Sequence, residues 1–458
     1  MARTSRIIVA GTAALTATFA FGVPAQAAST GVASVNARGE LLFTAGGGKT
    51  NRVTLTGSGG RITLDDRVAV RAGAGCAAVG GDRTRVVCTG VTYLRSIDLG
   101  DRDDVFVNRT SLYGNVYGGS GADTLTGGSG SESLYGNSGR DRINGGGGAD
   151  ELWGGSGADV LHGNGGRDSL HDGSGADRVY GDSGNDSFFD GPGKDVFHGG
   201  TGDDGFLAGA STAADRYHGG SGTDLVAYYE RTEGVTLDAD GKSDDGRKGE
   251  KDNIGTDVEN LTGGKGNDRI YGTNGANLLE GGPGDDRIYG RGGRDVLIGD
   301  VGRDHLDGGA GNDLLYGDPA LNSESPVVYA DVIVGGSGID TVDYGSYDQA
   351  VVVDLDGAKG DDGARGEKDT VGSDVENIMG GYGDDVLTGN AANNVLNGGW
   401  AGADVLRGRG GDDTLRSDRE RLGVSDSAAD TLDGGSHVKG DTCGFDTEDT
   451  AINCESTL

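Results

Sequence analysis

Large apolar residues recur at every ninth position along the middle of the chain, and an acidic residue stands two places before each of them. From Gly118 to Leu207 the chain divides into ten consecutive nonapeptides without a gap. In each of them the sixth position is the acid and the eighth position is the large apolar residue. Glycine is concentrated before each acid and predicts sharp turns, because it tolerates positive φ. Random low-complexity sequence does not hold two positions in phase for ten cycles, so the pattern argues against disorder.

The same two positions continue in two further runs. In the first run the acids are Asp123, Glu132, Asp141, Asp150, Asp159, Asp168, Asp177, Asp186, Asp195 and Asp204. A second run, Gly263 to Tyr316, has Asp268, Asn277, Asp286, Asp295, Asp304 and Asp313 at these positions. A third run begins at Gly380 with Asp385, Asn394, Asp404 and Asp413, and a one-residue insertion near Trp400 shifts its phase.

The nonapeptides "GGSGADTLT", "GGSGADVLH", "GGPGDDRIY" and "GGAGNDLLY" fit the motif GGxGxDxUx at every fixed position. The chain therefore resembles the repeats-in-toxin (RTX), or haemolysin-type, calcium-binding family. The resemblance implies an all-β fold, a parallel β-roll (a β-solenoid), with six residues turning and three forming a short strand. Two nonapeptides would make one rung, and calcium would lie between stacked turns.

The resemblance carries a set of calcium ligands onto the acids of the repeats. Glu132 is the sharpest departure from the motif and the first place to expect a missing ion. The candidate metal ligands are Asp104, Asp123, Asp141, Asp150, Asp159, Asp168, Asp177, Asp186, Asp195, Asp204, Asp224, Asp268, Asp286, Asp295, Asp304, Asp313, Asp340, Asp385, Asp404 and Asp413.

Electrostatics makes a cation necessary for such a stack. Carboxylates at the strand spacing repel one another by about 3.5 kcal/mol at an effective dielectric near 20. One buried aliphatic residue per nonapeptide contributes roughly 1.5–3 kcal/mol to folding. Ordering the backbone costs roughly 1–2 kcal/mol for each of the nine residues, which is more than that gain. The array is therefore expected to be unfolded without a cation. Oxygen-only ligands of high negative charge select a hard ion and suit Ca²⁺ better than octahedral Mg²⁺.

Two longer segments between the runs resemble each other, and both contain an acidic loop. "VTLDAD" and "VVVDLD" predict strands, and "DVENL" and "DVENI" predict the rung that restarts the repeat. The loops do not fit an EF-hand, so we expect solvated charged loops, with an extra calcium site as the alternative. The loop acids are Asp240, Asp244, Asp245 and Glu250 in one copy and Asp356, Asp361, Asp362 and Glu367 in the other.

The ends of the chain do not follow the nonapeptide pattern. A basic start, an apolar stretch from Ile7 to Val23 and a cleavage signal at Ala25-Gln26-Ala27 predict a signal peptide. In an exported chain the four cysteines favour disulfides. The expected pairs are the two that are close in the sequence, Cys76 with Cys88 and Cys443 with Cys454. A metal site is the weaker alternative, because no CxxC occurs.

These observations predict eight segments. They are a signal peptide (1–27), an N-terminal β cap (28–98), a first array (99–227), an intervening β segment (228–262), a second array (263–343), a second intervening segment (344–379), a third array (380–442) and a C-terminal cap (443–458).

Charge and motif content narrow the function. A formal net charge of −34 argues against nucleic acid and anionic membranes as partners and favours cations. No stretch after the signal peptide could span a bilayer. There is no HExxH or GxSxG motif, and the glycine-rich turns lead to Asp rather than to Lys, so they would repel phosphate. We expect no enzyme; an RTX-bearing secreted hydrolase or polysaccharide-modifying enzyme is the alternative.

One feature suggests a binding face. Tyr117, Tyr135, Trp153, His171 and Phe189 are spaced 18 apart and would form an outward ladder of rings. Stacking between rungs would explain the ladder by stabilising the sheet. A glycan, cell-surface or matrix partner is the alternative. The sequence as a whole predicts a secreted, extracellular calcium-binding protein that folds on binding Ca²⁺ and serves as a scaffold.

Overall fold

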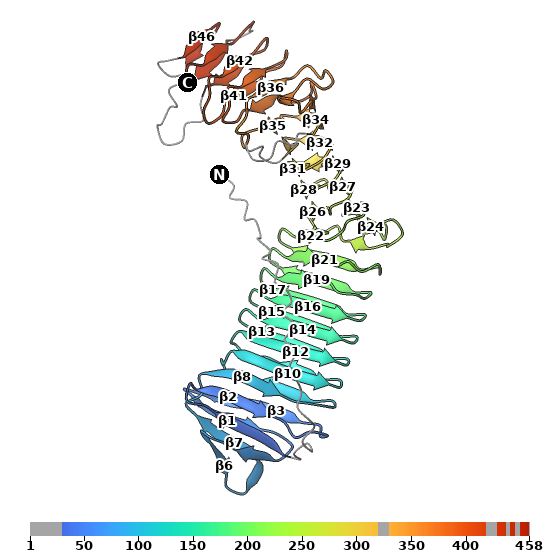
Figure 1. Cartoon of the computed structure of the whole chain (residues 1–458), viewed down its shortest axis with the longest axis vertical. Helices are drawn as coiled ribbons and strands as arrows, with labels where there is room; N and C mark the ends of the chain where they lie inside the picture. Colours follow the sequence, from blue (N-terminus) through green and yellow to red (C-terminus); the bar gives the residue numbers. More distant parts are fainter. Residues whose placement is uncertain (1–29, 319–328, 418–427, 437–439, 445–448, 458) are drawn as a thin grey trace.

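The structure is a computed structural model, and it describes residues 30–318, 329–417, 428–436, 440–444 and 449–457. The predicted signal peptide lies outside the described residues. Within those ranges every regular element is a β-strand, and no helix is long and apolar enough to cross a membrane. The strands stack into one elongated solenoid, with the N-terminal strands at one end and the C-terminal strands at the other (Figure 1).

Among the described residues, one continuous sheet of 21 strands runs along the solenoid. Its strands are β1 (Gly31–Val35), β2 (Glu40–Thr44), β5 (Val70–Ala72), β8 (Tyr93–Asp98), β10 (Gly114–Ser120), β12 (Glu132–Ser138), β14 (Glu151–Ser156), β16 (Ser169–Ser174), β18 (Ser187–Phe189), β20 (Gly205–Leu207), β22 (Leu225–Ala227), β26 (Asn260–Thr262), β28 (Leu278–Glu280), β31 (Val296–Ile298), β33 (Leu314–Tyr316), β35 (Thr341–Asp343), β39 (Asn377–Met379), β41 (Val395–Asn397), β43 (Thr414–Arg416), β45 (Thr442–Gly444) and β47 (Ser456–Thr457).

The opposite face is divided into three successive sheets of 12, 8 and 6 strands. The first contains β3 (Arg52–Ser58), β4 (Arg61–Asp65), β6 (Cys76–Val79), β7 (Asp82–Thr89), β9 (Val105–Asn108), β11 (Thr124–Thr126), β13 (Arg142–Gly147), β15 (Val160–Gly165), β17 (Arg178–Ser183), β19 (Val196–Thr201), β21 (Arg216–Ser221) and β25 (Asn253–Ile254). The second contains β23 (Val235–Asp238), β24 (Gly246–Arg247), β27 (Arg269–Tyr271), β29 (Arg287–Tyr289), β30 (Gly292–Gly293), β32 (His305–Gly311), β34 (Val332–Gly338) and β38 (Thr370–Val371). The third contains β36 (Val351–Asp354), β37 (Gly363–Ala364), β40 (Val386–Thr388), β42 (Val405–Arg407), β44 (Thr431–Asp433) and β46 (Thr450–Ile452).

The predicted 18-residue rung is the repeating unit of the stack. Strand β12 pairs with β14 in parallel, with Leu134 opposite Leu152, and β13 pairs with β15, with Ile143 opposite Leu161. Eighth-position residues therefore alternate between the two faces and meet in the interior, where these four are at most 1% exposed. This narrow apolar column is the core, and the turns on either side of it carry the acids. The parallel β-roll predicted from the motif is the fold of the chain.

The segment before the first rung supplies a mixed sheet that closes the end of the solenoid. Strands β3, β4, β7 and β6 pair in antiparallel order, whereas β8 pairs in parallel with β10 and so joins this unit to the first rung. A disulfide joins Cys76 of β6 to Cys88 of β7, and a second joins Cys443 to Cys454. Both predicted disulfide pairs are present.

The two intervening segments begin the second and third sheets. The predicted strands "VTLDAD" and "VVVDLD" are β23 and β36. Each pairs in antiparallel fashion with a short partner, β24 or β37, and in parallel with the next rung, β27 or β40. The β23–β24 hairpin stands out from the side of the stack, and the axis of the solenoid bends between β22 and β36 (Figure 1).

Candidate metal centre

The predicted metal ligands form continuous ladders along the edges of the solenoid. All of them are buried, with at most 2% of the side chain exposed. In most rungs the backbone N–H of one acid donates to Oδ1 of the acid in the next rung. The Asp123 N–H donates to Asp141 Oδ1 at 2.7 Å, and the Asp141 N–H donates to Asp159 Oδ1 at 2.7 Å. One oxygen of each carboxylate therefore fixes the spacing of the rungs.

The second oxygen of most of these carboxylates, Oδ2, has no hydrogen-bond partner although it is buried. Leaving a buried charged oxygen without a partner is costly, so each one calls for a compensating positive charge. None of the ion pairs between described residues involves these aspartates. The predicted ligands with this unpartnered Oδ2 are Asp104, Asp123, Asp141, Asp150, Asp159, Asp168, Asp177, Asp186, Asp195, Asp204, Asp224, Asp286, Asp295, Asp304, Asp313, Asp340 and Asp413.

The glycine that opens each repeat leaves room for the oxygens to converge. A Cβ atom added to Gly118 would lie 2.5 Å from Asp123 Oδ2 and 3.0 Å from the carbonyl oxygen of Gly136. A Cβ atom on Gly136 would likewise lie 2.5 Å from Asp141 Oδ2 and 2.6 Å from the carbonyl oxygen of Gly154. Carboxylate and carbonyl oxygens therefore face one small space in each turn. An all-oxygen donor set of this kind fits a hard cation such as Ca²⁺.

Burial changes the acidity of these carboxyl groups. Burial first, and then the charges of Asp123 and Asp159, raise the pKa of Asp141 to about 7, although its hydrogen bond from the Asp123 N–H lowers it. The pKa of Asp150 is raised to about 7 for the same reasons, with Glu132 and Asp168 as the neighbouring charges. Ionised carboxylates are thus costly here unless a cation accompanies them.

Some sixth positions depart from this arrangement. Glu132 accepts from the Gly128 N–H at 3.0 Å and from Asn108 Nδ2 at 3.0 Å, so protein donors satisfy both of its oxygens. Asp268 accepts from the N–H groups of Val235 and Gly264, and Asp385 from those of Val351 and Gly381, so neither has an unpartnered oxygen.

The ladders also contain acids that the sequence analysis missed. Asp215 and Asp331 are buried, and each has an unpartnered Oδ2. Asp215 Oδ1 accepts from the Asp195 N–H at 2.8 Å, and Asp331 Oδ1 accepts from the Asp304 N–H at 2.8 Å. Insertions displace both residues from the nonapeptide count. The remaining signal was an acid two places before a buried residue, as in Asp215–Tyr217 and Asp331–Ile333.

The prediction of solvated acidic loops was wrong for half of the loop residues. Asp240, Asp244, Asp356 and Asp361 are exposed or half-buried, whereas Asp245, Glu250, Asp362 and Glu367 are buried. Asp245 closes the hairpin, because Oδ1 accepts from the Asp238 N–H at 2.7 Å and Oδ2 from the Ile254 N–H at 2.9 Å. Glu250 forms a buried ion pair with Arg231 at 2.7 Å. These acids stabilise the local fold through protein donors.

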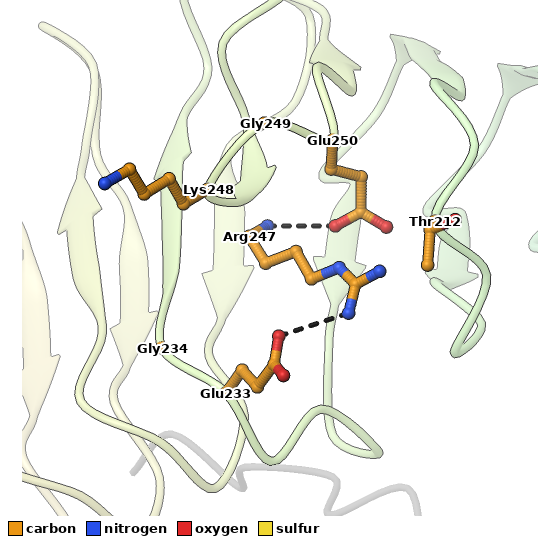
Figure 2. Close-up of a pocket in the computed structure, with 7 residues that line it drawn as sticks. All are labelled: Thr212, Glu233, Gly234, Arg247, Lys248, Gly249 and Glu250. Atoms are coloured by element: carbon orange, nitrogen blue, oxygen red, sulfur yellow. Dashed lines mark hydrogen bonds and ion pairs between the residues drawn. The ribbon is translucent and has the colours of Figure 1, made fainter.

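A hollow beside this hairpin is lined by Thr212, Glu233, Gly234, Arg247, Lys248, Gly249 and Glu250 (Figure 2). The Arg247 guanidinium pairs with Glu233 at 3.1 Å, and the Arg247 N–H donates to Glu250 at 2.9 Å. Lys248 points away from both carboxylates (Figure 2). The acidic groups of the hollow are thus engaged in holding the hairpin together.

The predicted ring ladder is present on the outer face of the continuous sheet. Ring centroids are 4.9 Å apart for Tyr117 and Tyr135, 6.2 Å for Tyr135 and Trp153, 3.6 Å for Trp153 and His171, and 4.1 Å for His171 and Phe189. All four pairs are stacked. A second ladder, which the sequence analysis did not predict, runs along the opposite sheet through His162, Tyr180, His198 and His218.

Stacked parallel rungs with a buried carboxylate in each turn define the class of the protein as a β-solenoid of acidic nonapeptide repeats. Comparison with protein families identifies the particular repeat. The model of the RTX calcium-binding nonapeptide repeat matches residues 115–142, 135–170, 153–188, 171–206, 255–288, 262–297, 289–319, 329–345, 370–400 and 401–419. The chain belongs to the RTX calcium-binding repeat family, and its repeats bind Ca²⁺. No curated protein matches the chain.

Proposed function

We propose that the sixth-position aspartates are the calcium ligands of a secreted protein that folds on binding calcium and acts outside the cell as a structural or adhesive scaffold. The observation that carries the proposal is the buried, unpartnered Oδ2 atom that recurs from turn to turn. We expect the weakest binding where protein donors already satisfy the acid, at Asp268 and Asp385. The eight predicted segments are our proposed division of the chain, with calcium bound in the three arrays.

Export is supported by the signal-like N-terminal sequence and by the two disulfides, which persist in oxidising compartments. A scaffold role is supported by the elongated shape and by the outward rings, of which Trp153 is 36% exposed. Stacking on the rings of a glycan is one way such a ladder could bind a partner. A glycan array probed with the calcium-loaded protein tests this part; binding that survives both Tyr135→Ala and Trp153→Ala would exclude the ladder as the binding face.

Calcium binding itself is tested by equilibrium dialysis of the full chain at defined free Ca²⁺, with bound metal measured by mass spectrometry. We expect several ions per chain and little competition from equimolar Mg²⁺, because the sites are irregular sets of oxygens. A chain that retains less than one calcium ion at millimolar free Ca²⁺ would contradict the proposal.

A further inference from the structure

Two repeats of the first array begin with Asp instead of Gly. These repeats are "DGSGADRVY", which begins at Asp172, and "DGPGKDVFH", which begins at Asp190. Asp172 lies in β16, and Asp190 follows β18 directly, so the two residues occupy equivalent places in neighbouring rungs. The other repeats between Gly118 and Leu207 begin with Gly. At that place a side chain enters the turn, because even a Cβ atom on Gly154 would lie 2.9 Å from Asp159 Oδ2.

The extra carboxylates meet a regular one. One carboxylate oxygen from each of Asp172, Asp190 and Asp195 lies within 4.8 Å of one from each of the others. Asp172 and Asp195 are fully buried, and Asp190 is partly buried. The regular turns contain a single sixth-position carboxylate beside glycine, so this turn has a different donor set.

Each of the three groups is fixed through one oxygen and leaves the other without a partner. Asp172 Oδ1 accepts from the N–H groups of Gly173 at 2.6 Å and Gly191 at 2.8 Å. Asp190 Oδ2 accepts from the Gly209 N–H and the Tyr217 hydroxyl, both at 3.0 Å. Asp195 Oδ1 accepts from the Asp177 N–H at 2.7 Å. The oxygens without hydrogen-bond partners are Asp172 Oδ2, Asp190 Oδ1 and Asp195 Oδ2.

No protein cation neutralises the cluster within the described part of the chain. The Arg231 guanidinium is bonded to Glu250 at 2.7 Å. None of the ion pairs between described residues involves Asp172, Asp190 or Asp195. Three carboxyl groups this close either hold protons or share a cation.

We propose that Asp172, Asp190 and Asp195 form a three-carboxylate calcium site that binds its ion more tightly than the regular turns of the same array. Asp172 and Asp190 add side-chain carboxylates at the place where the other repeats have glycine. Calcium affinity rises with the number of charged ligands. The same donors would take a trivalent lanthanide. This inference rests on calcium binding by the array and adds to it which turn holds the tightest ion.

The test compares the full-length wild type with Asp172→Asn and Asp172→Gly by calcium titration against a chromophoric chelator. Asn keeps the Oδ1 acceptor, and Gly restores the motif, so both variants preserve the turn. We expect the wild type to hold one ion at free Ca²⁺ too low to fill the other sites. Both variants should lose this ion or bind it at least tenfold more weakly. Asp348→Asn, which removes the same charge from an exposed position, should retain it.

Thermal melting distinguishes a shared cation from shared protons. With a cation at the site, Asp172→Asn lowers the melting temperature of the calcium-loaded protein, because a ligand is lost. If the three carboxyl groups share protons instead, Asp172→Asn raises that temperature, because only repulsion is removed. A higher melting temperature of Asp172→Asn in calcium, or retention of the tight ion by both variants, would overturn the inference while leaving calcium binding by the array intact. A wild-type chain that binds no calcium would overturn the proposed function as well.

Discussion

Each regular sixth-position aspartate uses its two oxygens for different purposes. At Asp159, Oδ1 accepts from the Asp141 N–H at 2.7 Å and sets the spacing of the rungs, whereas Oδ2 is buried without a partner and faces the turn. The motif predicted that these residues would be ligands, but it could not show this division. It also could not reveal that Glu132 is satisfied by Asn108, because that contact joins residues from different rungs.

Asp159→Asn keeps the rung-spacing hydrogen bond and removes one negative ligand. We expect calcium affinity at that turn to fall on the order of tenfold, since affinity follows ligand charge. The calcium midpoint of folding should rise accordingly, as measured by circular dichroism during titration. Asp348→Asn is the control for net charge and should leave the midpoint unchanged; equal effects of the two substitutions would argue against a ligand role.

The raised pKa values of Asp141 and Asp150, both about 7, predict the pH dependence of the calcium-free protein. A carboxyl whose folded pKa exceeds its unfolded value of about 3.9 adds stability that is fully present below that value. This stability is lost as pH rises through about 7. Chelator-treated protein should therefore show more strand by far-ultraviolet circular dichroism at pH 5 than at pH 8, and the reverse order would contradict the burial of these acids.

At the scale of the element, a three-residue strand gains stability from the rungs above and below it. Leu152 of β14 lies in the interior between Leu134 and Leu170, whereas the adjacent Trp153 points outward and stacks on His171. The period of 18 predicted both columns, because parallel strands place equivalent residues side by side. It did not predict the buried hairpin acids. Their burial depends on Arg231 and on backbone donors of the hairpin, which a count along the repeat does not include.

The adjacent residues Leu152 and Trp153 provide a matched pair of substitutions, one in the core and one on the outer face. Leu152→Ala should reduce the free energy of unfolding of the calcium-loaded protein by about 3 kcal/mol, because it leaves a cavity in a close-packed column. Trp153→Ala should cost about 1 kcal/mol, since it removes mainly ring stacking. Urea unfolding followed by far-ultraviolet circular dichroism measures both, and a larger loss for Trp153→Ala would show that the outer ladder, rather than the core, dominates.

At the scale of the whole molecule, stability spreads along a quasi-one-dimensional stack in which each rung contacts mainly its neighbours. One 21-strand sheet is continuous, whereas the opposite face changes sheet at β23 and β36. The sequence marked these places as repeated intervening segments. It could not show that they interrupt only one of the two faces, since that outcome depends on which strands pair in space.

Without calcium, we expect the apolar column to be too narrow to overcome the repulsion between stacked carboxylates. Far-ultraviolet circular dichroism of the chelator-treated full chain at pH 8, followed through a calcium titration, tests this expectation. We expect a spectrum of unordered chain that converts to strand as calcium is added and reverts when chelator is restored. An unchanged strand spectrum in the calcium-free protein would contradict it.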